Sequence, residues 1–183
     1  MSLRLRALEL HVPRWVARSA IRRLFEATGS AFGSDPICTD GSDHIALLER
    51  YAAFSATSAE RALADRTDLD DLSRRMWNNA YALGESLRRR LGVRSREDAL
   101  RAARIAYRMI GIDVRADPRG DMVVDRCSFA ERYSPQVCRV MSSLDAGMVA
   151  GLTGGGRLTF SERITEGRPR CLARIAWEGA PGP

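Results

Sequence analysis

The sequence predicts an α+β protein in which N-terminal helices precede a β-β-α-β-β unit, an antiparallel sheet with a helix across one face. Apolar residues recur at helical spacing up to about residue 110. From residue 111, apolar and charged residues alternate as in half-buried strands, and turns rich in glycine and proline separate the alternating runs. Helices that come first and strands that come later are typical of the α+β class.

This change of period divides the chain into a helical portion, 1–110, and an α+β portion, 111–178. A chain of 183 residues has the size of one domain and can bury a substantial core. We therefore expect the two portions to form one compact domain, with the helices as a wall against which the α+β portion is built.

The first predicted helix is basic and amphipathic and covers about 14–27, with Pro13 at its first turn. Such a helix packs on its own domain or on a second subunit, or it rests on an anionic membrane surface. The next segment, 29–43, is rich in Gly, Ser and Asp and holds Cys38. It is either a plain linker or a loop that covers a pocket.

The remaining elements follow from periodicity and from residues that cap helices or form turns. Three further helices are predicted at about 43–64, 69–91 and 95–110. In the α+β portion, a hairpin at 111–126 is followed by a helix at about 134–152 and by a second hairpin that pairs 157–165 with 170–177.

Every basic side chain in the sequence is an arginine, and the 29 arginines outnumber the 23 acidic residues. They are spread along the predicted helices, often beside acids, as in Glu49-Arg50 and Glu60-Arg61. A nucleic-acid-binding protein concentrates its arginines on one face or interleaves them with aromatic residues. The pattern here indicates solvated helix faces, and we expect no nucleic-acid partner.

No apolar run is long enough to cross a membrane, and the basic N-terminal stretch lacks the apolar core of a secretory signal. Four cysteines in such a chain indicate reduced thiols rather than a disulfide framework. We expect a soluble cytoplasmic protein whose N-terminal helices are free to form a homo-oligomer or to contact a pathway partner.

The most reactive stretch of the sequence is 124–177, which holds three of the four cysteines. No pair of them has the C-x-x-C spacing of a zinc ribbon or a thioredoxin motif, so we predict no cofactor. A zinc site stays open as an alternative, because Cys127, Cys138 and Cys171 with a nearby carboxylate offer enough ligands.

The last predicted hairpin places an acid among apolar residues. Because side chains alternate along a strand, Glu162 shares its inward face with Phe160 and other apolar residues. By the same alternation Cys171 lies in the inward row of the next strand. The hairpin is therefore expected to bring Glu162 and Cys171 close together.

The helix before this hairpin adds a thiol and a second acid. Cys138 and Asp145 are two helical turns apart, so they line one stripe with Met141 beside them. A buried carboxylate costs roughly several kcal/mol unless it is paired or protonated. Two such acids and two thiols on one layer predict a pocket for acid–base or nucleophilic chemistry. The catalytic candidates are Cys138, Cys171, Asp145 and Glu162.

Plainer interpretations of the same residues stay open. A free cysteine is among the most buried residue types and often only fills the core. Asp145 could cap a neighbouring element or pair with an arginine, and Glu162 could form a buried salt bridge with Arg126 or Arg174. The triple glycine at 154–156 ends a helix and lacks the Lys-Ser/Thr of a phosphate loop.

The run RCSFAERYSPQVCRVMSSLD and the tail LTFSERITEGRPRC resemble the C-terminal part of the L-2-amino-thiazoline-4-carboxylic acid hydrolase-like proteins. The resemblance rests on Cys127 with Phe129, on Cys138 seven residues before Asp145, and on the tail. The matching tail positions are Phe160, Glu162, Arg163, Thr165, Gly167 and Cys171. The resemblance covers the C-terminal third of the chain. A related pattern of cysteines occurs in the 4-vinyl reductase-type small-molecule-binding domains.

The resemblance implies hydrolytic opening of a thiazoline ring, and hence a small heterocyclic or amide-type substrate. In such a reaction a thiolate attacks the amidine-like ring carbon while a carboxylate moves protons. The residues expected to line the substrate site are Cys127, Phe129, Phe160, Arg163 and Met141. The alternative function is a non-catalytic small-molecule-binding or accessory module of a metabolic pathway.

Overall fold

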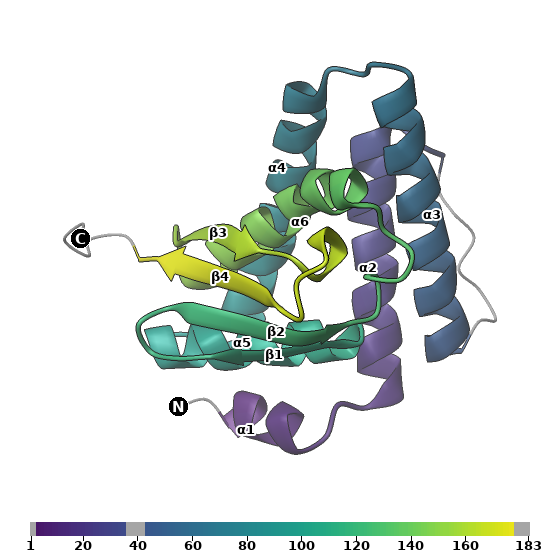
Figure 1. Ribbon diagram of the computed structural model, residues 1–183. Coiled ribbons are helices and arrows are strands. Elements are labelled where there is room, and N and C mark those ends of the chain that lie inside the picture. The colour runs from purple at the N-terminus through teal and green to yellow at the C-terminus, as the bar shows by residue number, and fades with distance from the viewer. Residues whose placement is uncertain (1–2, 36–42, 178–183) are drawn as a thin grey trace.

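The structure, a computed structural model, describes residues 3–35 and 43–177 and confirms the α+β class (Figure 1). Five helices come first in the described part of the chain, where the sequence predicts four, and a hairpin, a helix and a second hairpin follow as predicted. The elements are α1 (Leu3–Leu10), α2 (Arg14–Phe32), α3 (His44–Ala64), α4 (Leu69–Leu91), α5 (Arg96–Met109), β1 (Ile112–Ala116), β2 (Asp121–Cys127), α6 (Pro135–Thr153), β3 (Arg157–Glu162), the short 3-10 helix η1 (Ile164–Glu166) and β4 (Cys171–Ala176).

The structure departs from the predicted elements in three places. Helix α1 is not among the predicted helices, and α2 continues to Phe32 through residues predicted as part of a connection. Strand β3 ends at Glu162, because the chain then turns into η1. The segment 36–42, with Cys38, lies outside the described residues.

Side-chain caps explain where three of the helices begin. The Asp43 carboxylate accepts a hydrogen bond from the backbone N–H of Ala46 (2.8 Å), and the Ser95 and Ser134 hydroxyls accept in the same way at α5 and α6. Gly92 ends α4 in the left-handed conformation with φ 64°, as its place after the last apolar residue predicts. No helix in the described ranges is long and apolar enough to span a membrane.

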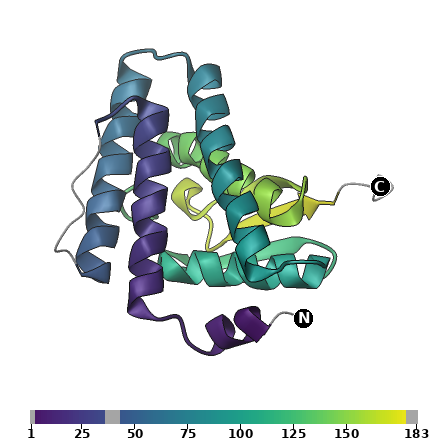
Figure 2. The same cartoon turned by 180° about the vertical axis from the view of Figure 1, so that it is seen from behind.

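The strands of the described chain form one antiparallel sheet with the order β1-β2-β4-β3. The pairing shifts by one residue in two places, after Asp113 between β1 and β2 and after Phe160 between β3 and β4. Figures 1 and 2, which view the molecule from opposite sides, show the helices gathered on one side of this sheet. The inner face of the sheet carries the buried side chains Ile112, Val114, Met122, Val124, Cys171, Ala173 and Ile175.

Helices α4 and α6 pack with their backbones almost in contact. A Cβ atom on Gly84 would lie 2.3 Å from the carbonyl oxygen of Met148, and one on Gly147 would lie 2.2 Å from the carbonyl oxygen of Trp77. A Cβ atom on Gly151 would come equally close to a carbonyl oxygen of α4, at 2.3 Å. Only glycine fits at these three positions, since every other residue carries a Cβ atom.

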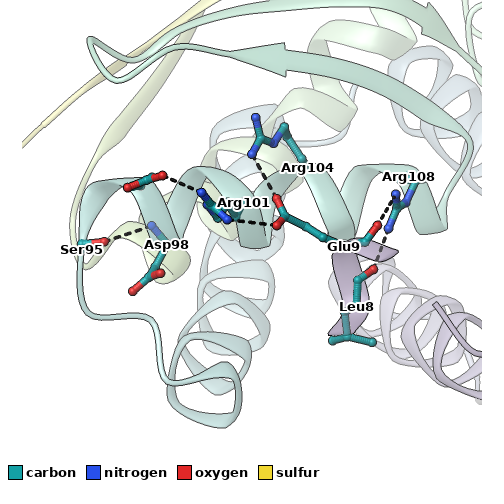
Figure 3. A network of polar contacts seen from close by, with 8 residues as sticks. Leu8, Glu9, Ser95, Asp98, Arg101, Arg104 and Arg108 are labelled. Atoms are coloured by element: carbon teal, nitrogen blue, oxygen red, sulfur yellow. Dashed lines mark hydrogen bonds and ion pairs between the residues drawn. The ribbon is translucent and has the colours of Figure 1, made fainter. Parts of the chain in front are cut away.

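Helix α1 is attached to α5 by a network of arginines (Figure 3). The Glu9 carboxylate accepts hydrogen bonds from Arg101 (3.0 Å) and Arg104 (3.2 Å). Arg108 donates to the backbone carbonyls of Leu8 (2.7 Å) and Glu9 (3.1 Å). Beneath this network Leu5 is fully buried in the same apolar cluster as the sheet. The network and the buried leucine together hold α1 against the rest of the protein.

Alanine at Gly147 or Gly84 is expected to destabilise the fold by about 3 kcal/mol, because the added methyl group would collide with a backbone carbonyl that cannot turn aside. This loss exceeds the gain of about 1 kcal/mol that alanine brings to a helix interior. Urea unfolding of the purified variants measures the difference.

Gly29 in α2 is the matched control, since the nearest atom to an added Cβ is Phe54 Cζ at 4.0 Å. Gly29→Ala should leave the free energy of unfolding unchanged or raise it slightly. Equal effects of Gly29→Ala and Gly147→Ala would contradict the close contact between α4 and α6.

Candidate functional site

A cavity of about 150 Å³ lies between the helices and the inner side of the first hairpin. Its walls come from α2, α3, α4, α5 and α6, from the β1 and β2 strands, and from the loop before α6. Most of the lining is apolar. The residues are Ala20, Arg23, Leu24, Tyr51, Leu83, Leu87, Ala103, Ala106, Tyr107, Met109, Ile110, Ile112, Cys127, Phe129, Tyr133, Cys138, Met141, Leu144, Asp145, Met148, Val149 and Leu152.

Helix α6 supplies one wall of the cavity and its reactive groups. Cys138, Met141, Asp145 and Met148 follow one another at intervals of three or four residues, so they share one side of the helix. All four line the cavity. The stripe predicted for this helix is therefore found in the structure, where it faces open space rather than packed core.

Asp145 is the most perturbed acid of the site. Burial raises the pKa of its carboxyl to about 6, while a hydrogen bond from Tyr107 and the charge of Arg163 lower it. The Tyr107 hydroxyl donates to Asp145 Oδ1 at 3.1 Å. Asp145 keeps part of its accessible surface only because it faces the cavity. The site thus holds a carboxylate that changes charge near neutral pH.

Three aromatic side chains form another part of the cavity wall. The Tyr51 and Phe129 rings meet edge to face with centroids 5.8 Å apart, and Phe129 stacks on Tyr133 at 5.4 Å. The tyrosine hydroxyls are bound away from the ring faces, to Thr28 (3.1 Å) and Ser55 (2.6 Å). Burial raises the pKa of both tyrosines, so they stay neutral. The three rings thus pack on one another and give the cavity an aromatic, uncharged part of its wall.

Charges on Cys138 and Cys171 both raise the pKa of Cys127, so the three described cysteines lie near one another, but they do not all face the cavity. Cys138 and Cys127 line the cavity, whereas Cys171 is not among the lining residues. Cys171 is buried in the sheet, where its sulfur accepts a hydrogen bond from the backbone N–H of Ile164 at 3.3 Å. Burial raises the pKa of Cys127 to about 12 and also raises that of Cys171. Cys138 is therefore the cysteine best placed to act as a nucleophile in the cavity.

Glu162 does not belong to this group, and its expected inward position is wrong. Ser161 is an extra residue in β3, so Phe160 pairs with Ala173 but Glu162 pairs with Leu172. Paired residues of an antiparallel ladder share a face, and Leu172 faces away from the inward row that holds Cys171. The bulge moves the Glu162 side chain to the outer side of the sheet.

Phe160 and Arg163 lie close to the site but do not line the cavity. The Arg163 guanidinium sits 4.7 Å from the centre of the Phe160 ring and donates to the Ser142 hydroxyl at 3.2 Å. Its positive charge lowers the pKa of Asp145 without a direct hydrogen bond. These two residues influence the carboxylate from behind the cavity wall.

The sequence patterns did not indicate the contribution of the N-terminal helices to the site. These helices contribute Tyr107, Tyr51 and Arg23, although the sequence predicts them only as a supporting wall. A signal for Tyr107 does exist, because it lies on the buried face of α5 and a buried tyrosine hydroxyl needs a partner. That partner, Asp145, is 38 residues away in the sequence, so spacing alone does not reveal it.

No group of three or more metal-ligating side chains occurs within residues 3–35 and 43–177. Of the thiols named for the zinc alternative, Cys127 and Cys138 line the cavity, and Cys171 lies on the inner face of the sheet.

Comparison with protein families found no family whose pattern matches this chain, and comparison with curated proteins found no match either.

Asp145→Asn is expected to raise the free energy of unfolding by roughly 2–3 kcal/mol above pH 7. The folded state holds the Asp145 carboxyl with a pKa of about 6, above its ordinary 3.8, and therefore disfavours the charged form. Asparagine keeps the acceptor for Tyr107 and removes the charge. The advantage should fade as the pH falls from 6 to 4, where wild-type Asp145 becomes neutral too. Chemical unfolding between pH 4 and pH 8 measures it.

Asp125 is the control, since Arg115 lowers the pKa of this exposed carboxyl. Asp125→Asn should produce no stabilisation above pH 7. A pH-independent effect of Asp145→Asn would show that Asp145 is not buried as a charge.

Proposed function

We propose that this protein binds a small, mainly apolar molecule in the cavity between α2, α5 and α6, with Asp145 as its polar anchor. The observation that carries the proposal is a space of about 150 Å³ walled by leucine, methionine and aromatic side chains, with an ionisable carboxylate inside it. Binding sites for small molecules have this composition, an apolar surface with a few placed polar groups.

The size of the cavity limits the ligand. An engineered cavity of about 150 Å³ lined by apolar side chains is large enough to hold benzene. A molecule built on one ring, or an aliphatic molecule of similar volume, therefore fits in the cavity. The stacked Phe129 and Tyr133 rings favour a flat ligand.

The protonation state of Asp145 determines which polar group the ligand needs. At pH 7 a carboxyl with a pKa of about 6 is mostly ionised, and an ionised carboxylate only accepts hydrogen bonds. Tyr107 already donates to Oδ1. A ligand that reaches the carboxylate must bring a second donor, such as a hydroxyl, an amine or an amidine. Without it, the carboxylate is left poorly solvated in an apolar space.

Phenol is the first probe of this proposal. It should bind with a measurable heat and raise the unfolding temperature, and it should bind more tightly than toluene, which has the same shape but no donor. Titration calorimetry at pH 7.5 measures both affinities.

Ala106→Leu, which fills the cavity from α5, should abolish phenol binding while the protein stays folded. Ala82→Leu on the exposed side of α4 is the control and should bind phenol like wild type. If Ala106→Leu binds phenol as wild type does, the ligand does not occupy this cavity.

A hydrolase for a small cyclic amidine or amide is the second candidate, and the observation that favours it is that Cys138 and Asp145 share the cavity. Asp145 lies two helical turns from Cys138, about 10 Å along the helix axis, so the Cys138 proton would pass to it through bridging water. The thiolate would then add to the amidine carbon of a thiazoline. The ring C–S bond would then break as its sulfur receives that proton. Water would finally displace Cys138 and give the ureido product.

Turnover of 2-aminothiazoline-4-carboxylate tests this second candidate. Cys138→Ser and Asp145→Asn should each reduce the rate by at least about 100-fold, while Cys171→Ser should retain it, because Cys171 lies outside the cavity and serine keeps the acceptor for Ile164. If wild type releases no free thiol from this substrate, the hydrolase candidate is wrong and the binding proposal is unaffected.

We also propose that the protein works in the cytoplasm, and that the corner between α1 and α2 is where a second copy or a pathway partner would contact it. The three cysteines of the described chain are free thiols, which a reducing compartment favours. At that corner Leu10 and Trp15 are 90% and 73% exposed, an unusual position for large apolar side chains.

A further inference from the structure

We propose that Arg23 on α2 recognises an acidic group of the ligand, so that the preferred ligands are small apolar acids with a hydrogen-bond donor at the opposite end. This inference rests on the proposed binding function of the cavity and names the chemical class of its ligand. It assigns a role to a residue from the helical portion of the chain.

Arg23 is the one arginine and Asp145 the one acidic residue in the cavity lining of the described chain. Arg23 comes from α2, one turn after Ala20 and next to Leu24, both of which also line the cavity. The three residues are half-buried, so Arg23 adds a partly solvent-accessible guanidinium to the cavity lining.

The two charges are placed apart. The groups that shift the pKa of Asp145 are its own burial, Tyr107 and Arg163, and Arg23 is not one of them. No ion pair between Arg23 and Asp145 is formed either, although both line one cavity. A ligand that spans the cavity thus meets a hydrogen-bond acceptor at one end and a cation at the other.

Within the described residues no carboxylate pairs with Arg23. Other arginines of the helices are matched with acids, such as Arg101 with Glu9 and Glu97, and Arg89 with Glu85. A guanidinium that is partly withdrawn from water beside apolar walls gains more from an ionic partner than one on the open surface. Its planar fork matches a carboxylate, which it can bind with two parallel hydrogen bonds.

The test compares phenol with 4-hydroxybenzoate, which adds a carboxylate opposite the hydroxyl. Wild type should bind 4-hydroxybenzoate about 10- to 100-fold more tightly than phenol at low salt. Arg23→Gln should remove this preference, so that the ratio of its two affinities falls towards one. Arg23→Lys should retain part of the preference, because a lysine keeps the charge without the fork.

Arg18→Gln is the matched control, since Arg18 is a partly buried arginine of the same helix that does not line the cavity. It should keep the full preference for the acid. Circular dichroism and the unfolding temperature show whether each variant is folded. If Arg23→Gln is unfolded, Arg23→Lys is compared with wild type instead.

The possible outcomes separate the two proposals. If wild type binds neither probe, the binding function is wrong and the role of Arg23 falls with it. If both probes bind but the ratio of their affinities is the same in wild type, Arg23→Gln and Arg23→Lys, the binding function stands and the role of Arg23 is wrong. If Arg18→Gln loses as much of the preference for the acid as Arg23→Gln does, the preference comes from the overall positive charge of the helix. That result would also contradict the role of Arg23.

Discussion

The close contact between α4 and α6 determines where the reactive groups of α6 lie. Gly147 and Gly151 face α4, whereas Asp145 and Cys138 point in nearly the opposite direction around the same helix. Because glycine lets the two backbones touch, α6 is held at a fixed depth, and its other side is presented to α2 and α5. The cavity is the space left between these helices. A bulkier residue in the contact would push α6 into that space.

The main energetic cost of this arrangement is that it places a carboxylate in an apolar space. A single neutral hydroxyl, that of Tyr107, binds the Asp145 carboxylate directly, and Arg163 acts on it only through its charge. A purely structural acid would be expected to have a closer cationic partner, since arginines are abundant in this chain. The incomplete pairing of Asp145 is what distinguishes a site prepared for a ligand from a polar residue of an ordinary core.

The order of elements could be predicted from the sequence because each depends on local signals. Capping residues such as Ser95 and Ser134, and the change from helical to alternating periodicity, act within a few residues. The α6 stripe with Cys138 and Asp145 was predictable for the same reason. The position of Glu162 was not, because one extra residue at Ser161 reverses the face of the strand end. Tyr107 and Arg23 reach the cavity through tertiary packing, which spacing does not encode.

The two irregularities in strand pairing have a consequence for the protein in a crowded solution. In the order β1-β2-β4-β3 the strands β1 and β3 are the edges, and each is joined to its neighbour through a one-residue shift. A shifted, twisted edge that also bears exposed Asp113 and Arg157 is a poor template for a strand from another molecule. The bulge that removes Glu162 from the site thereby also protects the sheet against aggregation.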